Sequence, residues 1–97
     1  MLTYISLCTF TDKGLQNVKE TIRRADAVRE LASKFGAKMT DIHWTLGQYD
    51  LVAMVEAPDE ASATAFSLAV ASAGSVRMQT MRAYAREEMA TILGKLG

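Results

Sequence analysis

The fold of this chain is decided by the stretch Ile42-His43-Trp44-Thr45-Leu46-Gly47-Gln48-Tyr49-Asp50-Leu51-Val52. Apolar and polar side chains alternate on both sides of Gly47, which is typical of two β-strands joined in a hairpin. We expect a two-residue type II′ turn, because glycine adopts the positive φ of its first central position without steric cost. That turn pairs Trp44 with Leu51 and His43 with Val52.

The alternation gives this hairpin two different faces. One face is almost purely apolar and carries Ile42, Trp44, Leu46, Tyr49, Leu51, Ala53 and Val55. The other face carries Asp41, His43, Thr45, Asp50, Val52, Met54 and Glu56. We expect the apolar face, with both of its aromatic side chains, to pack against helices.

The composition indicates one globular domain over residues 1–97, with 49% hydrophobic residues and no net charge. The chain lacks the basic excess that is typical of nucleic-acid binders and the apolar run of about 18 residues that a membrane span requires. A single cysteine excludes an internal disulfide and is typical of the cytoplasm. We therefore expect a cytoplasmic protein that binds neither nucleic acid nor membranes.

The first third of the chain predicts a strand and then one long helix. Residues 2–10 form a strand that is apolar on both faces. Thr11 or Asp12 caps the helix and Gly36 ends it. Its apolar stripe, at three- and four-residue spacing, consists of Leu15, Val18, Ile22, Ala25, Val28, Leu31, Ala32 and Phe35. On the opposite face, Glu20 and Arg24 are spaced to form an ion pair.

The chain after the hairpin predicts a second helix, a fourth strand and a short terminal helix. Asp59 caps the second helix, residues 61–73, which is rich in alanine and contains no lysine or arginine. So many small side chains predict close packing on most of its circumference. Residues 76–84 carry the interspersed polar side chains of an edge strand. Beyond them an amphipathic helix carries Met89, Ile92, Leu93 and Leu96.

The resulting order is β-α-β-β-α-β with a terminal helix. Right-handed crossovers turn this order into a ferredoxin-like α+β fold, an antiparallel sheet with spatial strand order 4-1-3-2. The helices cover one face of such a sheet, yet its two central strands are apolar on both faces. We therefore expect the uncovered face to bind a second copy, giving a homodimer or a higher homo-oligomer.

The chain resembles the GYD-domain family of small bacterial proteins over nearly its whole length. The motifs that match are Phe10-Thr11 with Gly14, Arg24-Ala25, Trp44-Thr45-Leu46-Gly47-Gln48-Tyr49-Asp50, Val55-Glu56-Ala57-Pro58-Asp59 and Glu87-Glu88-Met89. Gly47, Tyr49 and Asp50 stand for the residues that name the family, with Gln48 in between. The resemblance implies a dimeric α+β barrel and brings no catalytic residues.

Two further similarities concern architecture alone. The hairpin is similar to that of the ligand-binding module of leucine-responsive regulators, whose helix-turn-helix half is absent here. Cofactor-free monooxygenases and muconolactone-isomerase-type enzymes share the same architecture, which is an analogy of fold and not of function.

Acid–base chemistry has one candidate group of residues. Asp41 and His43 share a strand face, and Asp50 lies diagonally beyond them, so a carboxylate can orient the imidazole as such catalysis requires. The alternative is a polar fringe on an edge strand at the dimer interface. Cys8 is separated from His43 by an intervening strand, about 10 Å away, which is too far for a thiolate–imidazole pair. We expect no metal and no cofactor within one chain.

Ligand binding has a second candidate group at one end of the sheet. There the topology brings Thr11 and Lys13, at a helix N-terminus, near Tyr49, Asp50 and Arg77, where free N–H groups and two cations can hold a small anion. The alternative is an ordinary capped helix beside a solvated lysine. Arg24 belongs to a solvated helix face in the simplest interpretation, and the family motif makes it a further ligand-binding candidate.

Three functional hypotheses remain open at this level. The first is a protein that binds a small molecule between sheet and helices or at the dimer seam. The second is a cofactor-independent oxygenase or isomerase that uses His43 and Asp50. The third is a structural assembly module without a ligand.

Overall fold

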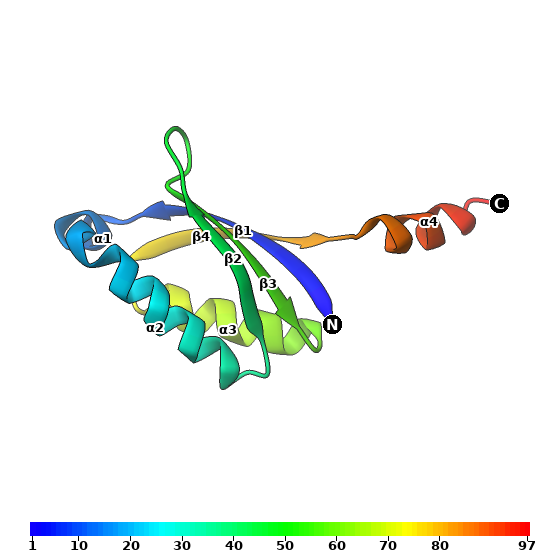
Figure 1. Ribbon diagram of the computed structural model, residues 1–97, viewed down its shortest axis with the longest axis horizontal. Helices are drawn as coiled ribbons and strands as arrows, with labels where there is room; N and C mark the ends of the chain where they lie inside the picture. Colours follow the sequence, from blue (N-terminus) through cyan, green and yellow to red (C-terminus); the bar gives the residue numbers. More distant parts are fainter.

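The computed structural model describes every residue from Met1 to Gly97. Its elements are β1 (Leu2–Phe10), α1 (Asp12–Gln16), the 3₁₀ turn η1 (Val18–Glu20), α2 (Thr21–Ser33), β2 (Lys38–Trp44), β3 (Leu51–Ala57), α3 (Glu60–Ser72), β4 (Val76–Ala83) and α4 (Arg86–Gly94). The strands form one antiparallel sheet in the order β2-β3-β1-β4. This order confirms the ferredoxin-like α+β fold (Figure 1).

Helices α2 and α3 lie on one face of the sheet, and the opposite face bears no helix (Figure 1). Tyr4, Ser6 and Cys8 of β1 point to the helices and are buried, whereas Ile5 and Leu7 point to the open face and are half-buried. No helix has the length and apolar character needed to cross a bilayer.

The hairpin register was predicted correctly. Trp44 pairs with Leu51 and His43 pairs with Val52, as the alternation of side chains requires. One irregularity was not foreseen: Met39 pairs with Val55 but Asp41 pairs with Met54, so Thr40 forms a β-bulge. The extra residue turns Met39 onto the covered face, where it is buried.

The predicted two-residue turn is wrong. Gly47 has the expected positive φ, 127°, but no hydrogen bond joins the Tyr49 N–H to the Leu46 carbonyl. The last backbone hydrogen bond between the two arms runs from Thr45 N to Asp50 O at 2.8 Å, and the Thr45 hydroxyl donates to the Tyr49 carbonyl oxygen at 2.6 Å. The intervening residues form an open loop that projects beyond the sheet (Figure 1), and Leu46 in this loop is fully exposed rather than packed.

The single long helix predicted between Thr11 and Gly36 is wrong as well. The chain breaks at Asn17 into α1, η1 and α2. The break leaves Leu15, Val18 and Ile22 of the predicted apolar stripe exposed. Thr11 caps the first turn as expected, and Gly36 follows the helix with a φ of 68°.

Helix α3 buries one face and not most of its circumference. Ala63, Phe66 and Val70 are buried, at spacings of three and four residues, while Leu68 is exposed. Asp59 caps the helix as predicted, because its carboxylate accepts a hydrogen bond from Ser62 N at 2.7 Å.

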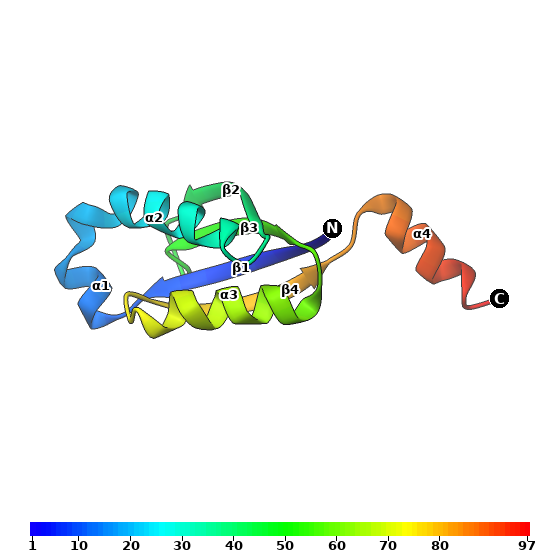
Figure 2. The ribbon, with the colours of Figure 1, turned by 90° about the horizontal axis from the view of Figure 1, so that it is seen from below.

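Helix α4 extends away from the layered body (Figure 2). An ion pair between Arg82 Nη2 and Glu88 Oε2, at 2.8 Å, ties its first turn to β4. The hydrogen bond from Arg82 also holds the pKa of the Glu88 carboxyl below its ordinary value.

Candidate functional site

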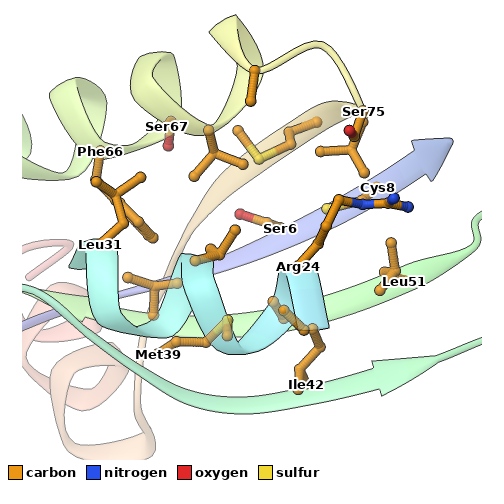
Figure 3. A pocket seen from close by; sticks show the side chains of 18 of the residues that line it. Ser6, Cys8, Arg24, Leu31, Met39, Ile42, Leu51, Phe66, Ser67 and Ser75 are labelled. Atoms are coloured by element: carbon orange, nitrogen blue, oxygen red, sulfur yellow. The ribbon is translucent and has the colours of Figure 1, made fainter. Parts of the chain in front are cut away.

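A cavity of about 420 Å³ lies between the sheet and helices α2 and α3 (Figure 3). Its lining is mostly hydrophobic, 19 of 25 residues. The hairpin residues that suggested chemistry in the sequence are not among them, so the cavity is a site that those motifs did not indicate.

The cavity exists because small side chains face it from several elements. The alanines that line it are Ala25, Ala27, Ala53, Ala63, Ala69 and Ala73. Their methyl groups leave unfilled a space between the helices and the sheet that larger side chains would occupy. At one end the rings of Phe35 and Phe66 lie 6.0 Å apart and join α3 to the end of α2. The alanine-rich helix thus produces a hollow where the sequence predicted close packing.

The cavity floor carries a row of protic side chains from β1. Tyr4, Ser6 and Cys8 alternate along this strand and all line the cavity. Ser6 Oγ and Thr80 Oγ1 lie 2.9 Å apart and hydrogen-bond to each other. The hydroxyl of Tyr4 is buried and has no hydrogen-bond partner, although buried polar groups are nearly always satisfied. Burial raises the pKa of the Cys8 thiol to about 11, so this cysteine is not a thiolate nucleophile at neutral pH.

Arg24 is the one charged residue that lines the cavity. The simplest interpretation of the sequence, a solvated helix face, is wrong for this half-buried side chain. Its alternative assignment as a ligand-binding residue stays a prediction. Its Nη1 donates to the carbonyl oxygen of Asn17 at 2.7 Å and its Nη2 to that of Gly14 at 3.3 Å. The guanidinium therefore closes the break between α1 and α2 and does not form the predicted ion pair with Glu20, which contacts Arg23 at 3.3 Å instead.

Thr11 and Lys13 lie where the topology placed them, at the end of the sheet, but they contact protein groups. Thr11 N donates to Ser75 O at 3.1 Å, and Lys13 Nζ donates to Ala73 O at 2.7 Å. These contacts join the start of α1 to the turn between α3 and β4. Arg77 is exposed on β4, paired in register with Thr9.

His43 and Asp50 do not converge on a common point. His43 Nδ1 lies 3.5 Å from Asp41 Oδ1, and both side chains are largely exposed. Asp50 turns to β1, where its Oδ2 accepts a hydrogen bond from Phe10 N at 2.9 Å. The carboxylate thus continues the β1–β3 ladder at the point where regular pairing stops.

The two hairpin aromatics take different positions. Trp44 faces the helices as predicted but is 42% exposed, and its Nε1 donates to Thr21 Oγ1 at 3.0 Å. Tyr49 was expected on the same face, which is wrong, because its hydroxyl donates to Gln79 Oε1 of β4 at 3.2 Å. Gln79 pairs with Leu7 on the open face.

Tyr4, Ser6 and Thr80, which supply polar groups on the sheet side of the cavity, were not predicted as site residues. A signal was present, since protic residues recur at positions 4, 6 and 8 of a strand that is otherwise apolar. With a period of two, they had to share one face. Ligand binding between sheet and helices was one of the hypotheses from the sequence, but no motif assigned these three residues to it.

Three comparisons with known proteins show what this chain is similar to. The sequence model of the family described as "GYD domain" matches residues 4–93. A Thermus thermophilus protein named "Glutamine synthetase and cystathionine beta-lyase binding protein" is 39% identical over 84 residues, 86% of this chain and 88% of that protein. The crystal structure of TTHA0845, also from Thermus thermophilus, superposes with a TM-score of 0.56 and 24% identity, covering 89% of this chain and 100% of that one. At that identity the likeness shows the fold alone.

Proposed function

This chain belongs to the GYD domain family, and we propose that it is a binding protein that holds a small, largely apolar molecule in the cavity between the sheet and α2 and α3. The observation that carries the proposal is the cavity itself, about 420 Å³ with mostly hydrophobic walls. Ligand pockets of proteins have this size and character, with a few polar groups that orient the ligand.

The polar groups of the floor support this proposal. A buried hydroxyl without a partner destabilises the folded state by about 1–3 kcal/mol. The Tyr4 hydroxyl is such a group, and an acceptor atom on a bound molecule would remove that cost. A molecule in the cavity would also restore the dispersion contacts that the lining side chains lack.

We propose further that the protein acts as a homodimer through its open sheet face. Ile5, Leu7, Val52 and Met54 form the centre of this face and remain half-buried in the single chain. Met81 beside them is 40% exposed. A contiguous apolar surface of this kind is typical of subunit interfaces, and a two-fold axis lets one patch cover its own copy.

Two other functions have less support. An acid–base enzyme would need His43 and Asp50 to reach one substrate, and Asp50 is hydrogen-bonded to the backbone of β1. A purely structural assembly module would be more stable with a filled core, because a cavity in the core lowers the free energy of unfolding. The cavity therefore argues against this function.

Docking onto a metabolic enzyme is a second candidate function. The T. thermophilus relative is named for binding glutamine synthetase and cystathionine beta-lyase. In this chain, the projecting hairpin loop bears a fully exposed Leu46 near a half-exposed Trp44, and tryptophan is the type of side chain that anchors protein contacts. This function can be tested by titrating purified glutamine synthetase, taken from the organism that makes this chain, with the parent chain and with Leu46→Asp. The variant should bind more weakly than the parent.

A pair of variants on one helix tests small-molecule binding. Ala69 lines the cavity, whereas Ala71 is exposed on the same helix. Titration with the neutral fluorophore N-phenyl-1-naphthylamine should show saturable binding to the parent chain, weakened at least about tenfold in Ala69→Leu because the added side chain occupies the cavity. Ala71→Leu should bind like the parent. Equal affinity in the two variants would place the fluorophore elsewhere.

A further inference from the structure

The cavity has a charged end and an apolar end. Arg24 and Ser75 lie together toward one end, and Phe66 and Leu31 lie toward the other (Figure 3). Two contacts agree with this arrangement. Arg24 donates a hydrogen bond to the carbonyl oxygen of Gly14, in the first helix after β1, while the ring of Phe66 lies 6.0 Å from that of Phe35, just before β2. A ligand that fills this space therefore meets one cation and, beyond it, hydrocarbon walls.

The positive charge of Arg24 has no opposite charge beside it. No carboxylate lies within 4.0 Å of its guanidinium, and its two hydrogen bonds go to neutral carbonyl groups. A guanidinium carries five N–H donors in a fixed fork, so donors remain after these two bonds. The two carbonyls also restrict the side chain, so that its fork is already ordered when a ligand arrives.

We propose that the cavity takes an amphipathic monoanion, with its carboxylate on Arg24 and an apolar chain that runs along β1 toward Phe66. This inference rests on the proposed small-molecule binding and names its ligand class. A carboxylate suits the guanidinium because the pair forms two parallel charge-assisted hydrogen bonds. It also neutralises a charge that is costly to leave unpaired beside an apolar cavity.

The opposite end of the floor offers a further polar contact. From Cys8 to Tyr4 the strand rises about 13 Å, so a chain of that length would extend from the charged end to the unpartnered Tyr4 hydroxyl. A ligand with an oxygen atom at its far end would accept a hydrogen bond there. The inferred class is thus a medium-chain carboxylate, with or without a terminal oxygen.

Three probes of equal length test the inference by isothermal titration calorimetry at neutral pH: decanoate, 1-decanol and decylamine. We expect decanoate to bind at least about tenfold more tightly than decanol, because a hydrogen bond between charged partners is worth roughly that factor or more. Decylamine should bind most weakly, since its cation meets another cation.

Variants then test whether Arg24 causes the preference for decanoate over decanol. Arg24→Gln should reduce the affinity for decanoate to that for decanol, and continued binding of decanol would show that the variant keeps its cavity. Arg24→Lys keeps the charge and should retain part of the preference. Arg29→Gln removes a charge from an exposed position of the same helix and should bind decanoate like the parent.

The outcomes separate this inference from the proposed function. Equal binding of decanoate and decanol by the parent chain overturns the monoanion inference and leaves small-molecule binding in place. A preference for decanoate that persists in Arg24→Gln also overturns the inference. Absence of binding for all three probes overturns both. If Arg24→Gln does not fold, the parent series and Arg24→Lys still decide the outcome.

Discussion

The two faces of the sheet differ in a way that composition does not suggest. The helix-covered face of β1 presents Tyr4, Ser6 and Cys8, whereas the open face presents the more apolar Ile5 and Leu7. The larger aliphatic side chains therefore lie on the side without helices. The crossover connections of the chain, and not the hydrophobicity of one strand, decide which face the helices cover. Neither face is completely packed. The covered face borders a cavity, and the open face leaves apolar side chains exposed to solvent.

On the helix side of the molecule, Gly14 is the glycine at which a side chain would overlap the backbone. A side chain there would overlap the carbonyl oxygen of Ser75, a backbone atom. Gly14→Ala should therefore push α1 away from the turn before β4 and lower the free energy of unfolding by about 3 kcal/mol. Urea denaturation followed by circular dichroism measures this change. Gly94→Ala is the control, because its new side chain meets nothing within 4 Å; a loss of similar size there would show that the overlap is not the cause.

The open face is tested at Met54, which points away from the helices beside Ile5. Met54→Lys should weaken the proposed dimer by about 2 kcal/mol, because a charge would be buried against the second copy. Sedimentation velocity over a range of concentrations measures the shift. Leu68→Lys places the same charge on the exposed side of α3 and should leave the assembly unchanged. A Met54→Lys protein that sediments like the parent would place the interface on another surface.

Substitutions at Asp50 and His43 compare a polar side chain that is hydrogen-bonded to the backbone with one that is largely exposed. Asp50→Ala removes the acceptor of the Phe10 N–H and should cost about 1.5 kcal/mol of unfolding free energy, while Asp50→Asn, which keeps an oxygen, should cost less. His43→Ala should change stability by at most about 0.5 kcal/mol, because the imidazole is largely exposed. Thermal denaturation of the three variants ranks them. A larger loss for His43→Ala than for Asp50→Ala would reverse these assignments.

At Gly47 we expect a modest loss of stability that arises from the backbone conformation alone. Its φ of 127° is unfavourable for a side chain, yet nothing lies within 4 Å of the position that a Cβ would take. Gly47→Ala should therefore destabilise the protein by about 1 kcal/mol through backbone strain alone. The melting temperature measures it, and an unchanged value would show that the loop relaxes to a negative φ.

The fold was predictable because its main signals are local. The alternation around Trp44 and Leu51 set the register, and glycine at positions 36 and 74 marked the helix ends. The break at Asn17 was not predictable from periodicity, since apolar residues continue at helical spacing through it. What stabilises the break is a contact seven residues away along the chain, from Arg24 to the Asn17 carbonyl.

The candidate site was less predictable for a related reason. Tyr49 was assigned to the covered face by extending the strand alternation, but the regular ladder begins only at Leu51, so the alternation does not apply to it. The cavity depends on small residues that come from several different elements and leave the space between the helices and the sheet unfilled. No single motif encodes that combination.

The bulge at Thr40 bears on how copies of this protein can meet. It interrupts the regular spacing of unpaired N–H and C=O groups along β2, the outermost strand on that side of the sheet. A regular edge is a template for another strand, and chains that add edge to edge build open fibrils. The distortion of β2 disfavours that route on this side of the sheet. It agrees with the homodimer proposed above through the open face, where a two-fold contact would close on itself after two copies.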